Sequence, residues 1–400
     1  MRRAWIAFAL IVLAIAAVVA ALSWLLLHGH LELVAWLLAA LVVSLVGTAV
    51  WQAVRGHRRR GVLLIAGAVL VAATVGGYAW SLNGKLSDID RIDASAIGQG
   101  DRPDASPNRS INVLLMGADN PDRLADKPTV AELLADGDWD PGAYRSDTMM
   151  VVHIPADRSA AYVVSIPRDS YVPIHDPEGR EHGLDKINAA FSAYGPIGTW
   201  RTVENLTGLR MNHMAIIDYA GFTDLTDAIG GVEVYIPEAV YDPKQHQQWE
   251  QGTTLLKGEL SLKYVRMRYG LAEGDFSRVD RQQNFMRALM RKTLADDTLG
   301  NPIKLSNILD AIAGNLTVDS GWTNGDIRAL AVSLRGLDAS KVKFLTLPLE
   351  RYDTVEGAGS VNIIDDSAAR ELWRAVREEK VRGYVRDHPE DALPDDDEVS

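Results

Sequence analysis

The fold is decided by Arg145-Ser-Asp-Thr-Met-Met-Val-Val-His-Ile-Pro-Ala-Asp-Arg-Ser-Ala-Ala-Tyr-Val-Val-Ser-Ile-Pro-Arg-Asp169. This stretch contains two short apolar runs, 148–154 and 161–166, rich in β-branched residues, which are typical of strands. The connection at 155–159 is short enough for a β-hairpin, so the start of one strand should lie beside the end of the other. Because both runs are almost continuously apolar, we predict strands that are covered on both faces.

Further apolar runs and helical patterns extend on both sides of this hairpin. The other runs predicted to be strands are 111–116, 213–217, 232–236 and 342–347. Apolar residues recur with helical periodicity at 197–206, 222–229, 279–294, 303–312, 327–334 and 368–381. This alternation predicts an α/β domain with a mixed central sheet covered by helices on both faces.

The first 82 residues are predicted to form a transmembrane region with three helices. Three runs without charged residues, 4–27, 33–54 and 61–82, are each long enough to cross a hydrocarbon layer about 30 Å thick. Arginines precede the first run and separate the second from the third, so the positive-inside rule places the end of the third run outside the cell. A cleaved signal peptide is the alternative for the first run, although no small-residue cleavage site precedes the second.

The remaining sequence divides into a linker, a domain and a tail. Residues 83–110 are polar and rich in Gly, Pro, Asp and Ser, and they predict a linker with a short helical portion near 86–92. The domain is expected over 111–386. The acidic, proline-containing tail, 387–400, is predicted to be disordered.

Charge and cysteine content exclude several classes of function. The first 82 residues hold six Lys or Arg and one Glu, which leaves 35 basic and 52 acidic residues in the other 318 and a formal charge of −17 there. Such an acidic domain disfavours nonspecific binding of nucleic acid, and we predict no nucleic-acid partner. The chain has no cysteine, which excludes disulfides and thiol catalysis.

Four charged residues border the predicted strands. Asp119 follows the first strand, Arg145 and Asp147 precede the second, and Arg168 follows the third. If the first strand runs opposite to the second, all four gather at one end of the sheet, where α/β proteins usually bind ligands. The two carboxylates suit Mg²⁺, whereas zinc is a poor fit because the chain has no cysteine and no paired histidine motif. Simple ion pairing of the four charges is the alternative.

A second group of cationic residues lies further along the chain. Arg266 and Arg268 are two residues apart and share a face if this segment is extended. Ser277 and Asp280 have the spacing of a capping box, which predicts a helix start. One stripe of that helix holds Arg278, Arg281, Gln282 and Phe285. The planar arginine fork matches phosphate oxygens, so we predict an anion site; a solvated basic face is the alternative.

At these residues the chain resembles the LytR-CpsA-Psr family of membrane-anchored enzymes of bacterial cell-wall assembly. The motifs that carry the resemblance are Gly117-Ala-Asp119, Arg145-Ser-Asp-Thr-Met149, Ser165-Ile-Pro-Arg-Asp169, Lys186-Ile-Asn-Ala-Ala190, Gly230-Gly-Val232, Arg266-Met-Arg268 and Asp275-Phe-Ser-Arg-Val-Asp-Arg-Gln-Gln283. They run in order from about residue 111 to 294, and weaker similarity continues to about 381.

The resemblance implies transfer of a glycopolymer, such as teichoic acid, from a polyprenyl diphosphate carrier onto peptidoglycan. This reaction makes a phosphodiester and releases polyprenyl phosphate. The resemblance also implies a multi-pass protein of the cell membrane with an extracellular catalytic domain. A domain that holds diphosphate beside the bilayer agrees with the two cationic groups described above.

Residue roles carried over from the family form three groups. The metal group, which holds Mg²⁺, is Asp119 and Asp147. The diphosphate group comprises Arg145, Arg168, Arg266, Arg268, Arg278, Arg281 and Gln282, with Lys186 and Asn188 lining the same cleft. The catalytic group comprises Asp119, Asp147, Arg168 and Asp275, the last of which would position an arginine or assist the incoming hydroxyl.

One segment departs from the family pattern. Residues 120–142 intervene between Asp119 and Arg145 where the family has a short connection. The insertion has a capping-box signal at Thr129 and Glu132, which predicts a small helix. It caps the acceptor side on one interpretation and is a tolerated surface insertion on the other.

Two other functions are compatible with the same residues. A diphosphate hydrolase would use the same clamp with water in place of the sugar hydroxyl. A noncatalytic envelope sensor or transcription attenuator would bind lipid-linked polymer without needing the carboxylate of Asp147. The sequence does not identify the polymer, the catalytic base or the oligomeric state.

Overall fold

The computed structural model describes most of the chain beyond residue 83. The described residues are 44, 47–52, 54–56, a scattered set between 62 and 81, 84–97, 102–106, 108–119, 130, 134, 139–142, 144–267, 275–293, 302–313, 316–334, 337 and 339–394. They fall into two compact units, Met1–Ser87 with Asp296–Ser306, and Asp88–Ala295 with Asn307–Ser400. Within the described residues, no helix has the length and apolar character needed to cross a bilayer. The predicted membrane spans lie largely outside those residues and stay a prediction.

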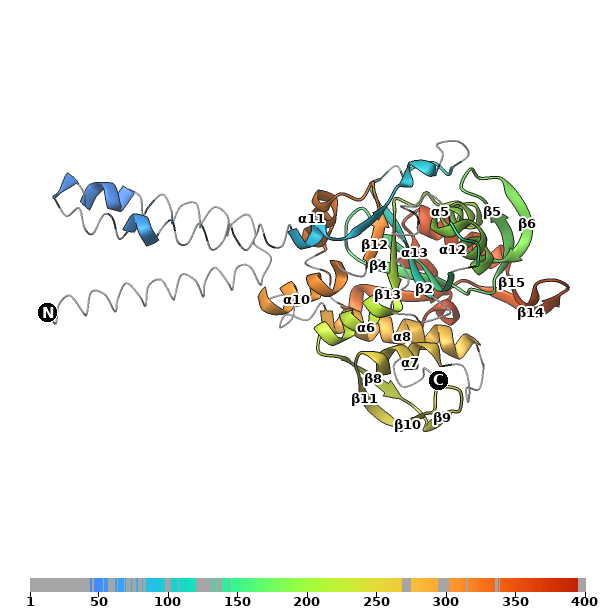
Figure 1. Ribbon diagram of the computed structural model, residues 1–400. Coiled ribbons are helices and arrows are strands. Elements are labelled where there is room, and N and C mark those ends of the chain that lie inside the picture. Colours follow the sequence, from blue (N-terminus) through green and yellow to red (C-terminus); the bar gives the residue numbers. More distant parts are fainter. Residues whose placement is uncertain are drawn as a thin grey trace. The chain divides into compact units, whose positions relative to one another are not determined.

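The second unit is built on a mixed sheet (Figure 1). Within the described residues this sheet has seven strands in the order β1-β12-β7-β2-β3-β4-β13. Their bounds are β1 (Asp90–Ile92), β2 (Ile111–Asp119), β3 (Arg145–Ile154), β4 (Ala161–Ile166), β7 (His213–Asp218), β12 (Leu316–Asp319) and β13 (Val342–Thr346). β3 pairs antiparallel with both β2 and β4, as the hairpin predicted, while β2 pairs parallel with β7 and β4 with β13.

Both faces of the sheet are buried against helices. Alternate residues of β3 enter different cores because side chains alternate across a strand. Met149 and Val151 join a core that includes α5 (Ile187–Thr207) and α12 (Asp366–Arg377). Met150 and Val152 join a core on the other face, against which α8 (Asp275–Thr293) and α11 (Asn324–Ser333) pack. The prediction of a mixed sheet with helices on both faces is confirmed.

Smaller elements surround this framework. The remaining helices are α6 (Tyr219–Ala228), α7 (Glu259–Arg266), α10 (Pro302–Ala313) and α13 (Val381–Asp387). Two-stranded sheets are formed by β5 (Tyr171–His175) with β6 (Glu181–Lys186), β8 (Val232–Ile236) with β11 (Gly252–Leu256), β9 (Val240–Asp242) with β10 (Gln247–Trp249), and β14 (Leu349–Val355) with β15 (Gly359–Ile364). A separate apolar core joins α6, α7 and α8 to β8 and β11. The predicted strand at 232–236 therefore lies outside the central sheet.

The predicted linker and tail are both wrong in part. Residues Asp90–Ile92, expected to continue a helix, form β1 and pair with β12 in the central sheet. The tail was expected to be disordered from 387, but α13 ends at Asp387 and the backbone N–H of Leu393 donates to the carbonyl oxygen of Phe344 at 3.0 Å. Residues 395–400 lie outside the described residues. Both ends of the domain are thus longer than composition indicated.

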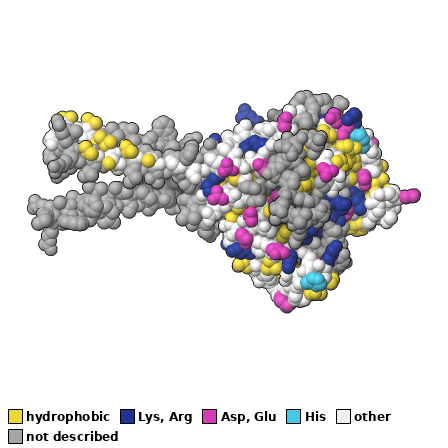
Figure 2. Space-filling model, in the orientation of Figure 1, with side chains coloured by type: hydrophobic (Ala, Val, Ile, Leu, Met, Phe, Trp, Pro, Cys, Tyr) yellow, Lys and Arg dark blue, Asp and Glu magenta, His cyan; other side chains and the backbone are white. Residues whose placement is uncertain are grey.

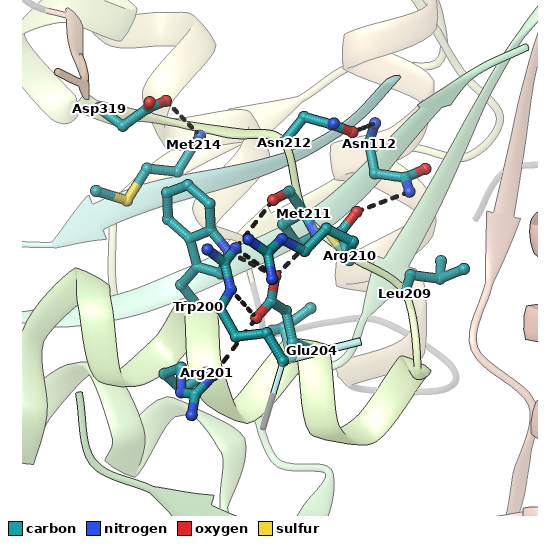
Figure 3. A network of polar contacts seen from close by, with 12 residues as sticks. Asn112, Trp200, Arg201, Glu204, Leu209, Arg210, Met211, Asn212, Met214 and Asp319 are labelled. Atoms are coloured by element: carbon teal, nitrogen blue, oxygen red, sulfur yellow. Dashed lines mark hydrogen bonds and ion pairs between the residues drawn. The ribbon is translucent and has the colours of Figure 1, made fainter. Parts of the chain in front are cut away.

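A buried ion pair with Glu204, which is labelled in Figure 3, ties the predicted linker to the domain. Both nitrogens Nε and Nη2 of Arg102 donate to the carboxylate of Glu204 on α5, at 2.8 and 2.7 Å. The same carboxylate accepts from the indole Nε1 of Trp200 at 3.1 Å and from the backbone N–H of Met211 at 2.9 Å. Four donors therefore satisfy one buried charge, which fixes residue 102 against the end of α5.

The insertion at 120–142 is packed into the domain where the structure describes it. Trp139 donates its indole N–H to the carbonyl oxygen of Ser192 at 3.0 Å, and its ring meets Phe191 edge-on at 5.5 Å. It lies over Gly195, where α5 is interrupted (φ 65°) just before Pro196, and a Cβ at Gly195 would come within 3.0 Å of the indole. This end of the insertion is therefore docked on α5. The interpretation that the insertion caps the acceptor side stays a prediction.

Candidate functional site

Charged side chains gather where β3 begins and β4 ends. Arg168 Nη1 contacts Asp147 Oδ1 at 2.6 Å, and Arg168 Nε contacts Asp169 Oδ2 at 3.3 Å. Lys186 Nζ, at the end of β6, lies 3.3 Å from Asp169 Oδ1. The structure thus brings together three residues that the sequence assigned, Asp147, Arg168 and Lys186. Asp169 joins this group.

The backbone around Arg168 is held by neighbouring elements. The N–H of Asn188 donates to the carbonyl oxygen of Arg168 at 3.1 Å, and the N–H of Ile187 donates to that of Ser170 at 2.8 Å. These donors belong to the first turn of α5, whose N–H groups have no partner within the helix. The N–H of Asn362 in β15 donates to the carbonyl oxygen of Asp169 at 2.8 Å. The segment carrying Arg168 is therefore fixed from both sides.

Arg278 on α8 meets Arg168 across a small cavity. The walls of this cavity are Pro167, Arg168, Asp169, Arg278, Val279, Tyr352 and Asn362. Arg278 is only 3% exposed, so its charge is largely desolvated. Arg168 and Arg278, which are 110 residues apart in the sequence, therefore line the same cavity. With Lys186, the described cluster has three cations against the two carboxylates of Asp147 and Asp169.

Other predicted diphosphate ligands lie on α7 and α8. The guanidinium of Arg266 stacks over the ring of Tyr219, 4.5 Å from its centroid. Arg281 lies 5.5 Å from the ring centroid of Tyr264, and Gln282 donates through Nε2 to the carbonyl oxygen of Val265 at 3.2 Å. These side chains bind α6, α7 and α8 to one another. The described contacts do not bring them to Arg168.

Two predictions about this region are wrong, and one alternative interpretation is excluded. Arg266 was expected on an extended segment, but it is the last residue of α7, whose eight residues favour a helix through a strongly amphipathic pattern. The helix expected to begin after Ser277 begins at Asp275. The stripe holding Arg278 and Arg281 is buried and is not a solvated basic face.

Burial makes these arginines electrostatically costly. Burial lowers the pKa of Arg281 below its usual range, while Tyr264 and Asp242 act in the opposite direction. On the face of the molecule visible in Figure 2, both basic and acidic side chains of the described residues reach the surface.

The structure describes the other assigned residues only in part. Asp119 ends β2 and pairs with Arg145 across a bulge in the β2–β3 register, and the side chain of Arg145 is exposed. The side chains of Asp119 and Asp275, and the whole of Arg268, lie outside the described residues. Within those residues, the group of side chains close enough to share a metal ion is His388, Glu390 and Asp391. The predicted Mg²⁺ site at Asp119 and Asp147 stays a prediction.

Two residues of the cavity wall were missed by the sequence reading. Tyr352 and Asn362 belong to the hairpin of β14 and β15. Residues 349–355 alternate imperfectly between apolar and polar types, but a glycine-rich turn follows at 356–359, and together these signals indicate a hairpin. A hairpin prediction there would still not have placed Tyr352 beside Arg168, because that contact depends on how β15 meets Ser170.

Comparison with known proteins gives one family. The family model described as the LytR_cpsA_psr family matches residues 84–378. The cell wall biosynthesis protein LcpA of Corynebacterium glutamicum is 32% identical over 326 residues, which cover 74% of this chain and 60% of LcpA. The match thus spans less than two thirds of that relative's length.

A second relative and a solved structure extend this likeness. The polyisoprenyl-teichoic acid–peptidoglycan teichoic acid transferase TagU of Halalkalibacterium halodurans is 32% identical over 231 residues, which cover 54% of this chain and 73% of TagU. The crystal structure of TagV from Bacillus subtilis superposes with a TM-score of 0.54 at 23% identity, covering 68% of this chain and 98% of that one. The structural likeness supports the fold.

Proposed function

This chain belongs to the LytR-CpsA-Psr family, and from that membership we propose that it is a phosphotransferase acting on a lipid-linked cell-wall glycopolymer. It moves the polymer from a polyprenyl diphosphate carrier onto peptidoglycan. Relatives named as teichoic acid transferases support this assignment. The observation that carries it is the cationic cluster of Arg168, Lys186 and Arg278 beside the start of β3, because arginine guanidinium groups match phosphate oxygens.

The proposed reaction is a displacement at phosphorus. A hydroxyl of the peptidoglycan attacks the phosphorus that carries the glycan, and the bond to the bridging oxygen of the diphosphate breaks. Polyprenyl phosphate leaves with that oxygen, and the hydroxyl proton passes to a base or to solvent. Arg168 and Arg278 bind the phosphoryl oxygens. Lys186 adds a third positive charge nearby, because Lys186 and Arg168 both contact the carboxylate of Asp169. Such catalysis depends on positioning and charge neutralisation.

A divalent cation is part of this proposal. Asp147 offers hard oxygen donors at the strand end next to Asp119, a donor set that suits Mg²⁺. The ion would neutralise the developing charge on the phosphoryl oxygens.

The site is proposed to work at the outer face of the cell membrane. Three apolar runs within residues 4–82 and the arginines between them support three spans that end outside. A polyprenyl carrier keeps its diphosphate at the bilayer surface, so a tethered domain would meet its substrate there. Expression with a reporter fused after Ser400 would test this orientation.

Product analysis tests the reaction itself. Purified full-length protein in detergent micelles is incubated with a polyprenyl-diphosphate glycan, soluble peptidoglycan strands and Mg²⁺. We expect polyprenyl phosphate and peptidoglycan joined to the glycan by a phosphodiester in equal amounts. Removal of Mg²⁺ with EDTA should lower the rate at least about a hundredfold, since the ion supplies several kcal/mol of charge stabilisation.

Other products would identify other functions. Free phosphorylated glycan formed in the presence of the acceptor would indicate a hydrolase and would overturn the transfer proposal. Binding of the lipid-linked glycan without any product, with or without Mg²⁺, would indicate a sensor. An EDTA-resistant rate would reject the metal while leaving the transfer reaction in place.

A further inference from the structure

Three side chains with metal-ligating atoms gather where the chain leaves α13. His388 follows the end of α13, and Glu390 and Asp391 belong to the short helix η3 (Pro389–Asp391). One ligand atom of each residue lies within 4.8 Å of the other two. Ligands at about 2.1 Å from a Zn²⁺ ion lie about 3.4 Å apart in tetrahedral geometry, so small side-chain rotations would bring all three to one ion. We call these three residues the His388 cluster.

The imidazole of His388 is held by two neighbours. Its ring stacks on Tyr384 with centroids 4.5 Å apart and planes inclined by 25°. Nδ1 lies 3.3 Å from Glu390 Oε1, and Nε2 lies 3.8 Å from Glu371 Oε1 on α12. Metal-binding histidines usually direct their second nitrogen to a carboxylate, carbonyl or water. The geometry therefore gives Nδ1 the role of ligand and Glu371 the role of this outer carboxylate.

Tyr384 also orients the third ligand. Its hydroxyl donates to Asp391 Oδ2, and the tyrosine itself is only 5% exposed. One buried aromatic side chain thus positions both His388 and Asp391. Ligands that neighbouring contacts already hold in place lose less freedom when they bind an ion.

The cluster has more negative than positive charge. Glu371, Glu390 and Asp391 surround one imidazole, and the ion pairs of the described residues include none between these carboxylates and a lysine or arginine. Burial raises the pKa of Asp391; the Tyr384 hydroxyl opposes this shift, and the charge of Glu390 adds to it. A divalent cation would relieve the repulsion among the carboxylates.

His182 has similar contacts without this excess of negative charge. Its Nε2 lies 2.9 Å from Asp176 Oδ2, and its ring centroid lies 4.9 Å from that of Tyr194. Arg180 pairs with the same carboxylate oxygen at 2.7 Å and offsets its charge. The two histidines therefore differ in the number of carboxylates that lack a cationic partner, and His182 provides a matched control.

The His388 cluster directly precedes a segment that contacts two elements of the domain. The backbone N–H of Leu393 donates to the carbonyl oxygen of Phe344 on β13 at 3.0 Å. Arg287 Nη1 on α8 donates to the carbonyl oxygen of Pro394 at 2.6 Å. An ion bound at the cluster would therefore fix the start of the segment 392–394.

We propose that the His388 cluster binds a divalent transition-metal ion, which fixes residues 392–394 against β13 and α8. Nδ1 of His388 and one carboxylate oxygen each from Glu390 and Asp391 coordinate the ion, and water completes its shell. An imidazole with two carboxylates suits Zn²⁺ better than Mg²⁺, which prefers oxygen ligands alone. The set has one histidine and so differs from the paired-histidine motifs of zinc enzymes. The proposal does not depend on the transfer reaction.

A Zn²⁺ titration tests the site directly. Full-length protein without a histidine tag, in detergent micelles, is titrated calorimetrically with Zn²⁺ in the presence of excess Mg²⁺, which occupies sites built from oxygen alone. We expect one Zn²⁺ ion per chain. His388→Gln should weaken binding at least about tenfold, because it removes the nitrogen ligand. Glu390→Gln should weaken it as well, and because this side chain is 67% exposed, the variant keeps the test open if His388→Gln does not fold.

Two further variants separate ligand geometry from general charge. Tyr384→Phe keeps the stacked ring but removes the hydroxyl that orients Asp391, so Zn²⁺ binding should weaken about tenfold. His182→Gln removes an imidazole that lies outside the cluster, and binding should stay within about twofold of wild type. Absence of Zn²⁺ binding to the wild type, or equal weakening by His388→Gln and His182→Gln, overturns the proposal.

Hydrogen exchange tests the effect of the ion on the chain. Zn²⁺ should slow exchange of the Leu393 amide at least about tenfold in the wild type, because binding to the folded state suppresses local opening. The same addition should leave that amide unchanged in His388→Gln. Zn²⁺ bound to the wild-type cluster without any slowing at Leu393 would also overturn the proposal, because the ion would then not hold residues 392–394.

Discussion

Two arginine–carboxylate pairs in this domain have nearly the same contact distance but very different surroundings. Arg168 and Asp147 meet at 2.6 Å with side chains that are 17% and 15% exposed. Arg102 and Glu204 meet at 2.7 Å with side chains that are 5% and 0% exposed. The first pair lies at the ends of two strands beside a cavity, while the second lies inside the domain, with Glu204 on α5 (labelled in Figure 3).

The difference lies in what else each carboxylate binds. Glu204 accepts from two nitrogens of Arg102, from Trp200 and from the backbone of Met211, so a ligand could replace none of these donors without breaking the fold. Arg168 has a second carboxylate, Asp169, and lines a small cavity together with Arg278. Distance alone therefore does not separate a structural pair from a functional one; access and the number of partners do.

The largest effect is expected from Arg168→Ala. Loss of one phosphate-binding guanidinium should lower the rate of transfer about a thousandfold, the size seen when a preorganised charge donor is removed. Because the side chain is partly exposed and not part of the apolar core, the thermal unfolding midpoint should move by only a few degrees. Rates of phosphodiester formation and unfolding midpoints measured on the same preparation check both statements.

Arg168→Lys sharpens this prediction. It keeps the charge but loses the planar fork, so we expect a transfer rate between those of wild type and Arg168→Ala. A rate within about twofold of wild type in Arg168→Ala, with the fold intact, would show that this pair is structural too, and the contrast with Glu204 would disappear.

The next effect concerns stability. Glu204→Ala leaves the buried charge of Arg102 without its partner, which should lower the free energy of unfolding by about 3–5 kcal/mol. The transfer rate per folded molecule should change less than tenfold, since no described contact joins this pair to the cavity. Urea unfolding of full-length protein, followed by near-ultraviolet circular dichroism, gives the first quantity.

The double variant Arg102→Met/Glu204→Leu provides the control. Replacing both charges with apolar groups of similar size should recover part of the lost stability, because neither partner is then buried alone. If Glu204→Ala unfolds like wild type, the pair does not hold residue 102 to the domain. A loss of transfer larger than that of Arg168→Ala would contradict the division between the two regions.

The pair of Asp147 and Arg168 was predictable from sequence, whereas the pair of Arg102 and Glu204 was not. Asp147 and Arg168 flank two apolar runs joined by a five-residue connection, so local geometry alone brings them together. Arg102 and Glu204 are 102 residues apart, and Arg102 sits in a polar stretch whose composition indicates a linker. Nothing local distinguishes that arginine from a solvated one, because its partner is chosen by tertiary packing.

The same reasoning explains why the sequence placed only part of the proposed diphosphate site. The motif on α8 indicated an anion site, but helical periodicity could not show that Arg278 turns to Arg168 while Gln282 turns to α7. Short strands were also missed. β1 has three residues and β12 four, too few for a period-2 pattern to stand out from the adjacent polar sequence.

The smallest expected effect is that of Tyr352→Leu. Tyr352 is 52% exposed and lines the cavity with Arg168 and Arg278, and we expect its ring to stack on the first sugar of a bound glycan. Such a ring contact contributes about 1 kcal/mol, which corresponds to roughly a fivefold fall in kcat/KM for the glycan donor.

Tyr241→Leu is the matched control, because Tyr241 is 51% exposed and lies on β9, outside the cavity wall. Both variants should unfold within about 0.5 kcal/mol of wild type. An equal fall in kcat/KM for both would mean that Tyr352 contributes only general surface character, and the hairpin of β14 and β15 would then have no part in recognising the glycan.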